Sequence, residues 1–326
     1  MEEIKNHKTP IVRGFVIGVF DRVYEGGCKI RCEHLNRYRS RTLIYMAEHL
    51  KEGSLTQWHE TQKIEEGGIA YFLKRYKPDG EEIKNEIGWL TSSILRSCRA
   101  FAVPEVRSAS VEEGWIKMGY IDVASGPSEA VMTDRLIKSA LELHRLIRTD
   151  QPHVRGGASA SEYSAYTKRR AQQKIAALEG TEFEISGDVV LWMEKKIEAL
   201  KTKYFSVVHR DLRARHLLFG IDTMKPTLID WEFSDVSDPA QDLAKVIYDA
   251  VVDRRLNRDE VVKYVIDSYA QESGMSAKEI EERVRVFLPI IPLEHAMSFV
   301  TRKPEGYEAK VMADVCFVQS LYEEEK

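Results

Sequence analysis

Two short apolar segments, each followed closely by an aspartate, constrain the fold of this chain more than any other feature of its sequence. The segment Phe205–Val208 leads into a loop that contains Asp211, and residues 227–229 lead directly into Asp230. Short apolar runs bounded by polar residues are typical of buried strands. The sequence therefore predicts two short strands, each followed by a carboxylate.

Carboxylates placed in this way suit phosphoryl transfer, which needs an oriented acceptor hydroxyl, metal ions that bridge the phosphates, and cations that offset charge. Asp211 can orient the acceptor hydroxyl and accept its proton. Asp230 can bind Mg²⁺, a hard cation that prefers oxygen ligands. Taken singly, each aspartate is better explained as a turn former or a helix cap. Their order and spacing favour the chemical interpretation.

A lysine inside an apolar segment is the third candidate. Lys74 lies within residues 69–76, among aromatic and aliphatic side chains. A buried ammonium costs free energy unless it is paired. Glu86, in the helical segment that follows, is the expected protein partner, and nucleotide phosphates are the other. The alternative is a lysine on a sheet edge that faces water.

Strand signals come first along the chain and helix signals later. Strands are expected at 55–64, 69–76 and 115–122, with a tight hairpin turn at 65–68. Apolar residues at helical spacing predict helices at 81–95, 134–148, 189–200 and through most of the chain from residue 239 onward. This segregated order predicts the α+β class, with a boundary near residues 125–127.

Composition excludes several classes of protein. The formal net charge of -4 argues against a dedicated nucleic-acid-binding protein. No apolar run is long enough for a membrane span, and the charged N-terminus carries no secretory signal. The 4 cysteines form no disulfide framework, which favours a cytoplasmic location. A metal site at Cys28, Cys32 and His34 is disfavoured, because their spacing is unusual and no second ligand pair follows.

The sequence His-Arg-Asp-Leu at 209–212 resembles the catalytic loop of the protein-kinase-like superfamily, and Asp230 matches that superfamily's metal-binding aspartate. Residues 229–232 and 238–244 resemble the aminoglycoside phosphotransferase and choline kinase branch in particular. The resemblance implies that His209 and Asp211 belong to the catalytic site. It also implies that Asp242 braces the catalytic loop from a helix that begins at the Asp-Pro pair 238–239. An aspartate cap followed by proline is typical of a helix N-terminus. The Leu-His-Arg segment at 143–145 also resembles that branch, and His144 is expected to be a packing residue.

The same resemblance implies a two-lobed fold. Residues 43–124 are then a small nucleotide-binding lobe with an antiparallel sheet, and residues 125–326 are a mostly helical lobe with the catalytic loop and acceptor site. Residues 1–42 are an N-terminal extension whose role is open. The residues expected to bind ATP are Lys74, Glu86, Gly53 and Ser54 of a glycine-poor phosphate loop, and Met118 and Tyr120 of the hinge that meets the adenine.

One position departs from the family pattern. His216 stands five residues after Asp211, where the family carries an asparagine that is a second metal ligand. Imidazole is a poor ligand for Mg²⁺. Three interpretations of His216 follow. It holds a phosphate or a loop carbonyl while a single metal is used, or it favours a different metal such as Mn²⁺. The third interpretation is that catalysis is weakened or lost. Bacterial lipopolysaccharide core kinases resemble this chain at this position, which disfavours the last of these interpretations.

The sequence thus predicts an ATP- and Mg²⁺-dependent kinase that phosphorylates a hydroxyl of a small molecule. The acceptor is a sugar or amino-alcohol, either aminoglycoside-like or a lipopolysaccharide core sugar; a glycolipid acceptor would bring peripheral membrane contact. Basic residues within 145–174 disfavour a cationic acceptor, although a solvated helix face explains them as well. The alternative is a nucleotide-binding regulatory protein without turnover. Protein substrates are disfavoured, because Asp230 is followed closely by Asp238 and leaves no room for an activation segment.

Overall fold

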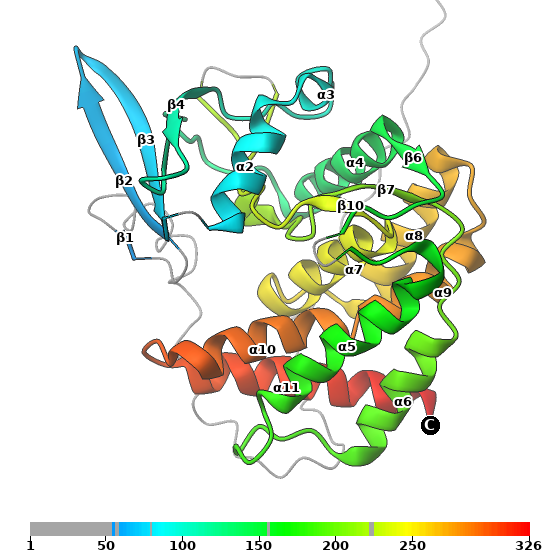
Figure 1. The fold of residues 1–326 in the computed structure, drawn as a ribbon. Helices are drawn as coiled ribbons and strands as arrows, with labels where there is room; N and C mark the ends of the chain where they lie inside the picture. The colour runs from blue at the N-terminus through cyan, green and yellow to red at the C-terminus, as the bar shows by residue number, and fades with distance from the viewer. Residues whose placement is uncertain (1–53, 56–58, 79, 155–156, 222–224) are drawn as a thin grey trace, which may run out of the picture. The chain divides into compact units, whose positions relative to one another are not determined.

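A computed structural model describes residues 54–55, 59–78, 80–154, 157–221 and 225–326, and residues 49–326 form one compact unit (Figure 1). Gly53, the cysteine and histidine cluster at 28–34 and the rest of the N-terminal extension lie outside the described residues. The predicted domain boundaries at 42/43 and 124/125 therefore stay predictions.

The N-terminal strands form one antiparallel sheet in the order β1-β2-β3-β5-β4. Its strands are β1 (Ser54–Leu55), β2 (His59–Glu66), β3 (Ile69–Tyr76), β4 (Val106–Ser110) and β5 (Trp115–Gly119). The turn between β2 and β3 is Gly67-Gly68, with φ of 59° and 79°. Two consecutive residues with positive φ are what a two-residue hairpin turn requires, so the predicted turn is confirmed.

The helix predicted over 81–95 is divided in two. It forms α2 (Glu81–Thr91) and α3 (Ser93–Arg96), separated by Ser92 in an extended conformation. The Ser92 hydroxyl accepts a hydrogen bond from Ile94 N at 3.3 Å, and this cap starts the second helix. The prediction of one continuous helix was wrong because a local cap outweighed the apolar periodicity. Helix α2 packs against β4 and β5 through a buried face that includes Glu86.

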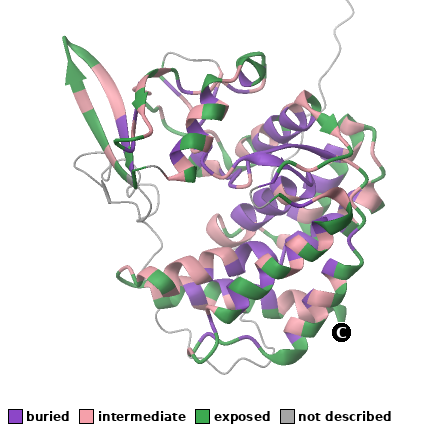
Figure 2. Ribbon diagram, in the orientation of Figure 1, coloured by how far each residue is buried: buried purple, intermediate pink, exposed green. Residues whose placement is uncertain are grey.

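The remainder of the chain is mostly helical (Figure 1). Its main helices are α4 (Glu129–Leu146), α5 (Tyr163–Ala176), α6 (Gly187–Glu198), α7 (Ala240–Tyr248), α8 (Arg258–Ser273), α9 (Ala277–Phe287), α10 (Ile290–Arg302) and α11 (Tyr307–Glu325). Three short strands lie among them in the order β10-β7-β6, comprising β10 (Asp235–Ser237), β7 (Phe205–Val208) and β6 (Arg148–Thr149). Figure 2 shows that the most continuous burial lies around β7, β10 and α7.

The two apolar runs that flank the catalytic loop are strands, as predicted. All residues of β7 are buried, and β9 (Thr227–Leu228) pairs with β8 (Leu217–Leu218). Helix α7 begins after Pro239, and the Asp238 carboxylate accepts a hydrogen bond from Ala240 N at 2.9 Å. Asp238 also pairs with Arg283, with Nε at 3.1 Å. The helix start predicted at the Asp-Pro pair is therefore confirmed.

Within the part of the chain that the structure describes, one stretch, Ala277–Arg302, is long and apolar enough to cross a membrane by length and composition alone. It comprises α9 and α10, and 56% of its most apolar window is buried against the rest of the protein. Buried core helices have this composition too, so the stretch is weak support for a membrane span.

Candidate active site

Lys74 lies in the middle of the N-terminal sheet. Its strand neighbours are Thr61 on β2 and Ile116 on β5, so β3 is not an edge strand. The side chain is only 3% exposed. The edge-lysine alternative is therefore excluded, and a buried ammonium in this position must be stabilised by anionic groups.

Three carboxylates surround the Lys74 ammonium. Its Nζ lies 2.8 Å from Glu86 Oε2, 2.6 Å from Asp230 Oδ1 and 3.1 Å from Glu232 Oε2. Burial lowers the pKa of Lys74, but Asp230, Glu86 and Glu232 outweigh burial and raise it overall. Burial raises the pKa of Glu86, against the opposing effect of Lys74. The predicted pairing of Lys74 with Glu86 is confirmed, whereas the Glu232 contact was not foreseen.

Helix α2 is fastened to the segment that carries Asp230. The Asn85 amide donates to the backbone carbonyl oxygens of Glu232 at 3.0 Å and Ser234 at 2.8 Å, and the Trp89 indole also donates to that of Ser234 at 3.0 Å. These contacts fix the distance between α2 and the Asp230 loop. Glu86 and Asp230 therefore meet at the same ammonium.

The catalytic loop is held by Asp242 of α7. One carboxylate oxygen accepts a hydrogen bond from His209 N at 2.9 Å, and the other accepts from Arg210 N at 2.7 Å. Asp242 is fully buried and also lies 3.2 Å from His144 Nε2. Arg210 has a φ of 65°, which is rare for a residue with a side chain. The bracing role implied by the family resemblance agrees with these contacts, and His144 is a hydrogen-bonding partner as well as a packing residue.

His209 links the two aspartate segments. Its ring is fully buried, its Nε2 lies 2.9 Å from the Ile229 carbonyl oxygen, and it packs edge-on against Trp231 at 4.8 Å between centroids. Burial lowers the pKa of His209, although nearby carboxylates oppose the shift. This position favours a role in holding the loops together, and a direct chemical role for His209 stays a prediction.

Asp211 is surrounded by cations. Its Oδ1 lies 2.9 Å from Arg213 Nε and 2.7 Å from Lys245 Nζ, and its Oδ2 lies 3.8 Å from Arg215 Nη2. Burial alone would raise the pKa of Asp211, but Arg213, Lys245, His216 and Arg215 hold it well below its ordinary value. The carboxylate is therefore ionised and able to accept hydrogen bonds.

His216 stands between the two aspartates. Its Nδ1 lies 2.8 Å from the Asp211 carbonyl oxygen, and its Nε2 lies 3.2 Å from Asp230 Oδ2. Burial lowers the pKa of His216 to about 3 although both aspartates oppose the shift, so the ring is neutral. With Nδ1–H donating to the carbonyl, Nε2 carries the lone pair; it accepts from Arg215 Nε at 3.1 Å and lies beside the Asp230 carboxylate. Metal-binding histidines are commonly oriented in this way, so His216 and Asp230 form a candidate metal site.

The other expected nucleotide-binding residues lie on the same sheet. Ser54 pairs with Thr61, which pairs with Lys74, so these backbone positions form a row across β1, β2 and β3. Met118 is buried in β5 and pairs with Phe72. Tyr120 follows β5, and Lys63 Nζ lies 4.6 Å from the centre of its ring. The nucleotide contacts of Ser54, Met118 and Tyr120 stay predictions.

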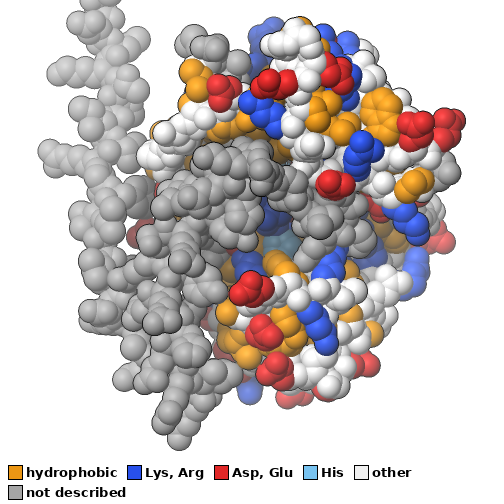
Figure 3. Space-filling view, turned by 90° about the vertical axis from the view of Figure 1, so that its left-hand side faces the viewer, with side chains coloured by type: hydrophobic (Ala, Val, Ile, Leu, Met, Phe, Trp, Pro, Cys, Tyr) orange, Lys and Arg blue, Asp and Glu red, His pale blue; other side chains and the backbone are white. Residues whose placement is uncertain are grey.

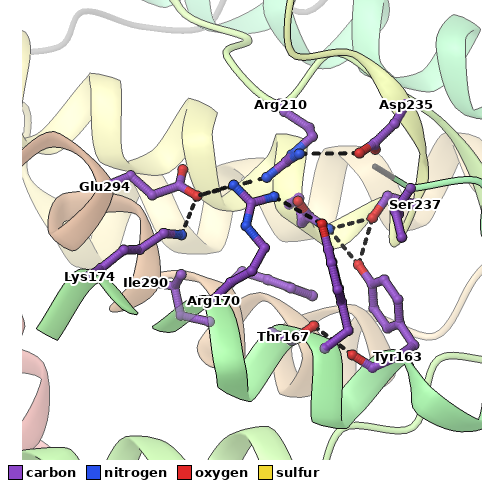
Figure 4. A pocket seen from close by; sticks show the side chains of 13 residues that line it. Tyr163, Thr167, Arg170, Lys174, Arg210, Asp235, Ser237, Ile290 and Glu294 are labelled. Atoms are coloured by element: carbon purple, nitrogen blue, oxygen red, sulfur yellow. Dashed lines mark hydrogen bonds and ion pairs between the residues drawn. The ribbon is translucent and has the colours of Figure 1, made fainter. Parts of the chain in front are cut away.

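A second polar cluster surrounds the Arg210 side chain and includes Glu294, Lys174 and Asp235 (Figure 4). The Glu294 carboxylate of α10 pairs with Lys174, with Arg170 Nη2 at 3.6 Å and with Arg210 Nη2 at 3.8 Å. Arg210 Nη1 also lies 3.1 Å from Asp235. Burial lowers the pKa of Lys174 to about 7, although Glu294 opposes the shift. The cavity among these side chains measures about 30 Å³, room for about two water molecules. Figure 3 shows basic, acidic and apolar side chains interspersed over the described part of one face.

A buried strand lysine paired with a helix glutamate, together with two loop aspartates, defines the protein-kinase-like class of phosphotransferases. The phosphotransferase enzyme family (APH) matches residues 58–276, more than half of the chain, and the chain belongs to this family. The predicted family, the two-lobed α+β fold class and the enzyme class, a phosphotransferase, are confirmed.

Solved structures share this fold at low sequence identity. The choline kinase LicA from Streptococcus pneumoniae has a TM-score of 0.58 and 17% identity, over 82% of this chain and 92% of that chain. The macrolide 2'-phosphotransferase MphH from Brachybacterium faecium has a TM-score of 0.54 and 18% identity, over 83% and 96%. A thermostable mutant of aminoglycoside phosphotransferase APH(4)-Ia, in ternary complex with ADP and hygromycin B, has a TM-score of 0.56 and 12% identity, over 86% and 98%. No curated protein matches in sequence.

Proposed function

We propose that this protein is an ATP-dependent kinase that transfers the γ-phosphoryl group to a hydroxyl of a small molecule, a sugar or an amino-alcohol. One observation carries the proposal, a continuous series of contacts from Lys74 to Asp211. Lys74 lies 2.6 Å from Asp230, Asp230 lies 3.2 Å from His216, and His216 lies 2.8 Å from the Asp211 carbonyl oxygen. The nucleotide lysine, the metal ligands and the acceptor carboxylate thus lie in the order that phosphoryl transfer needs.

The residues of this chain divide the reaction among them. Lys74 offsets charge on the nucleotide phosphates, and Asp211 orients the acceptor hydroxyl through a hydrogen bond. The hydroxyl oxygen forms a bond to the γ-phosphorus, the bond to the bridging oxygen breaks, and its electron pair leaves with ADP. The hydroxyl proton passes to Asp211 and then to water. Asp230 and His216 would hold the metal ion, which neutralises phosphate charge when bound.

The donor set at the metal site favours a particular kind of metal ion. Asp230 supplies an oxygen and His216 supplies an imidazole nitrogen, which lie 3.2 Å apart. Imidazole suits transition metals better than Mg²⁺, which prefers oxygen ligands. The pair therefore fits Mn²⁺ at least as well as Mg²⁺, and we propose that either ion supports the reaction.

The charges near Asp211 favour a neutral or anionic acceptor. Arg215 lies beside Asp211 with its side chain 54% exposed, so a cation faces the position of the acceptor. Arg213 and Lys245 add positive charge behind the same carboxylate. A polycationic aminoglycoside would be repelled there, whereas a neutral sugar or one bearing a phosphate or carboxylate would not. A panel of neutral, anionic and cationic sugars, assayed for ATP-dependent phosphorylation, tests this choice directly.

Replacing Asp230 with alanine is expected to weaken metal-dependent ATP binding by about 10-fold or more, because one ligand of the metal is lost. Titration calorimetry with ATP in Mg²⁺, in Mn²⁺ and in EDTA measures the effect. The matched control is Asp267→Ala, which removes an exposed carboxylate whose partner among the described residues is Lys263. Equal affinity of the Asp230 variant and the parent in Mg²⁺ and Mn²⁺ would count against the metal role.

Replacing His216 with asparagine is expected to shift the metal preference from Mn²⁺ toward Mg²⁺ by about 10-fold, because an amide oxygen replaces an imidazole nitrogen. The ratio of the apparent affinities for the two ions, measured through ATP binding, reports the shift. An unchanged ratio would mean that His216 does not touch the metal and serves only to link the loops.

A nucleotide-binding regulatory protein without turnover remains the second candidate, favoured by the imidazole at position 216 in place of an amide. Thermal shifts with ATP and Mg²⁺ or Mn²⁺, followed by the acceptor panel, separate the two. Stabilisation by nucleotide with no transfer to any acceptor would favour the regulatory function. We propose a cytoplasmic location for the enzyme, since ATP is the proposed donor.

A further inference from the structure

A buried lysine on α7 contacts the catalytic carboxylate from behind. Lys245 is 3% exposed, and its Nζ lies 2.7 Å from Asp211 Oδ1 and 2.7 Å from His295 Nε2. Burial of an ammonium is costly, so its place here is fixed by what it contacts. The charged groups that face it are Asp211 and Arg213 of the catalytic loop and Glu294 of α10.

The partners of Lys245 are themselves fixed from a distant helix. His295 Nδ1 lies 2.9 Å from the Tyr248 hydroxyl, and that hydroxyl donates to the buried carboxylate of Asp314 on α11. Burial, reinforced by Lys245 and Arg213, holds the pKa of His295 well below its ordinary value, so the ring is neutral. A neutral imidazole that donates from Nδ1 presents its Nε2 lone pair to Lys245. The orientation of Lys245 is therefore set by α10 and α11 as well as by Asp211.

The contacts of Lys245 and Arg213 determine which carboxylate oxygen of Asp211 can accept a hydrogen bond from an acceptor hydroxyl. Oδ1 is buried and is contacted by both Lys245 and Arg213, at 2.7 Å and 2.9 Å. The Asp211 side chain is nevertheless 12% exposed, so its accessible part lies away from Oδ1. Oδ2 has only the longer contacts, 3.4 Å to His216 Nδ1 and 3.8 Å to Arg215 Nη2, so it is the oxygen better placed to accept a hydrogen bond from an acceptor hydroxyl. Rotation of the carboxylate would exchange the two oxygens and is opposed by the attraction of two cations for Oδ1.

We propose that Lys245 is a positioning residue for phosphoryl transfer: with Arg213 it holds Oδ1 of Asp211, so that Oδ2 alone is presented to the acceptor hydroxyl. This inference rests on the proposed function. It adds a second residue from α7, the helix that also carries Asp242, and Lys245 itself lies outside the 238–244 motif. Its physical basis is that a reacting group displaced by about 1 Å loses about 10²-fold in rate.

The test compares Lys245→Met, Lys245→Arg and the control Lys196→Met by steady-state ATP hydrolysis, with water as the acceptor. Lys196 of α6 is also a helical lysine in an ion pair, with Glu325 at 2.5 Å, but it is unconnected with Asp211. Lys245→Met is expected to lower kcat by about 10²-fold while the KM for ATP changes less than about threefold. Lys245→Arg is expected to recover at least about 10-fold of that loss, because it restores a charged donor. Lys196→Met is expected to leave both parameters unchanged.

Thermal unfolding tests the contact between Lys245 and Asp211, with Lys245→Met introduced into the parent protein and into the Asp211→Asn variant. Lys245→Met is expected to lower the Tm of the parent, but not that of Asp211→Asn, where removal of Lys245 relieves its repulsion by Arg213. An unchanged kcat in Lys245→Met, or equal Tm losses in both backgrounds, would overturn the inference while the proposed function stands. A parent protein without any hydrolysis or acceptor phosphorylation would overturn the proposed function and this inference with it.

Discussion

Replacing Asp211 with asparagine is expected to lower kcat by about 10³-fold, while the Kd for ATP changes less than about threefold. The asparagine keeps the size of the side chain but cannot accept the proton of the acceptor hydroxyl. The residues proposed to hold the nucleotide and the metal, Lys74 and Asp230, are separate from Asp211, and they lie 2.6 Å apart on the other side of His216. Phosphorylation or hydrolysis assays give kcat, and calorimetry gives the affinity for ATP.

The same substitution also removes the charge that balances two buried cations. Arg213 and Lys245 lie 2.9 Å and 2.7 Å from Asp211 Oδ1, so the variant is expected to unfold more easily. Assays therefore belong well below the Tm of the variant. The control is Asp267→Asn, which alters an exposed pair and is expected to change neither kcat nor Tm. Undiminished turnover in Asp211→Asn would contradict the proposal that Asp211 is the catalytic carboxylate.

Replacing Lys74 with methionine is expected to destabilise the fold by about 3–5 kcal/mol at pH 8, because it leaves buried carboxylates without their cation. Glu86 Oε2, Asp230 Oδ1 and Glu232 Oε2 all lie within 3.1 Å of the Lys74 ammonium. The side chains of Glu86 and Glu232 are only 1% and 2% exposed, so water cannot replace the lost partner. The variant is also expected to bind ATP weakly, since the charge that faces the phosphates is gone.

The destabilisation in Lys74→Met is expected to depend on pH in a defined direction. Burial already raises the pKa of Glu86 against the opposing effect of Lys74, so loss of the lysine is expected to raise its folded-state pKa further above the unfolded value. Protonation then favours the folded state, so the loss of stability is small near pH 4 and grows as pH rises toward 8. Denaturant unfolding at several pH values measures this trend. A second substitution, Glu86→Gln, should recover part of the stability at pH 8. A loss that is independent of pH would contradict the charge explanation.

Local patterns predicted much of the fold correctly. The Gly67-Gly68 turn and the start of α7 after Asp238-Pro239 follow from the conformational limits of a few consecutive residues. The single helix expected over 81–95 was wrong at Ser92, because apolar periodicity says where a helix can be buried and not where a hydroxyl interrupts it. Errors of this kind lie at element boundaries, where a single side-chain hydrogen bond decides the outcome.

Candidate residues were found where a charged side chain interrupts an apolar segment. Lys74 lies within an apolar strand, which predicted a buried cation. Asp230 directly follows an apolar run, which predicted a carboxylate at a strand end. Lys245 and Glu232 gave no such signal. Lys245 occupies an ordinary helical position of α7, and its burial against Asp211 depends on how α7, α10 and the catalytic loop pack together.

The sequence by itself determined the order of the elements, the positions of Asp211 and Asp230 after short apolar strands, and the pairing of Lys74 with Glu86. These depend on short-range spacing and on the need of a buried charge for a partner. Only the tertiary structure decided which side chains surround those groups. The Lys74–Asp230 contact joins residues 156 positions apart, and the contact between Asp211 and Lys245 joins the loop after β7 to helix α7. Such contacts arise from packing of separate elements, and no local pattern of residues records them.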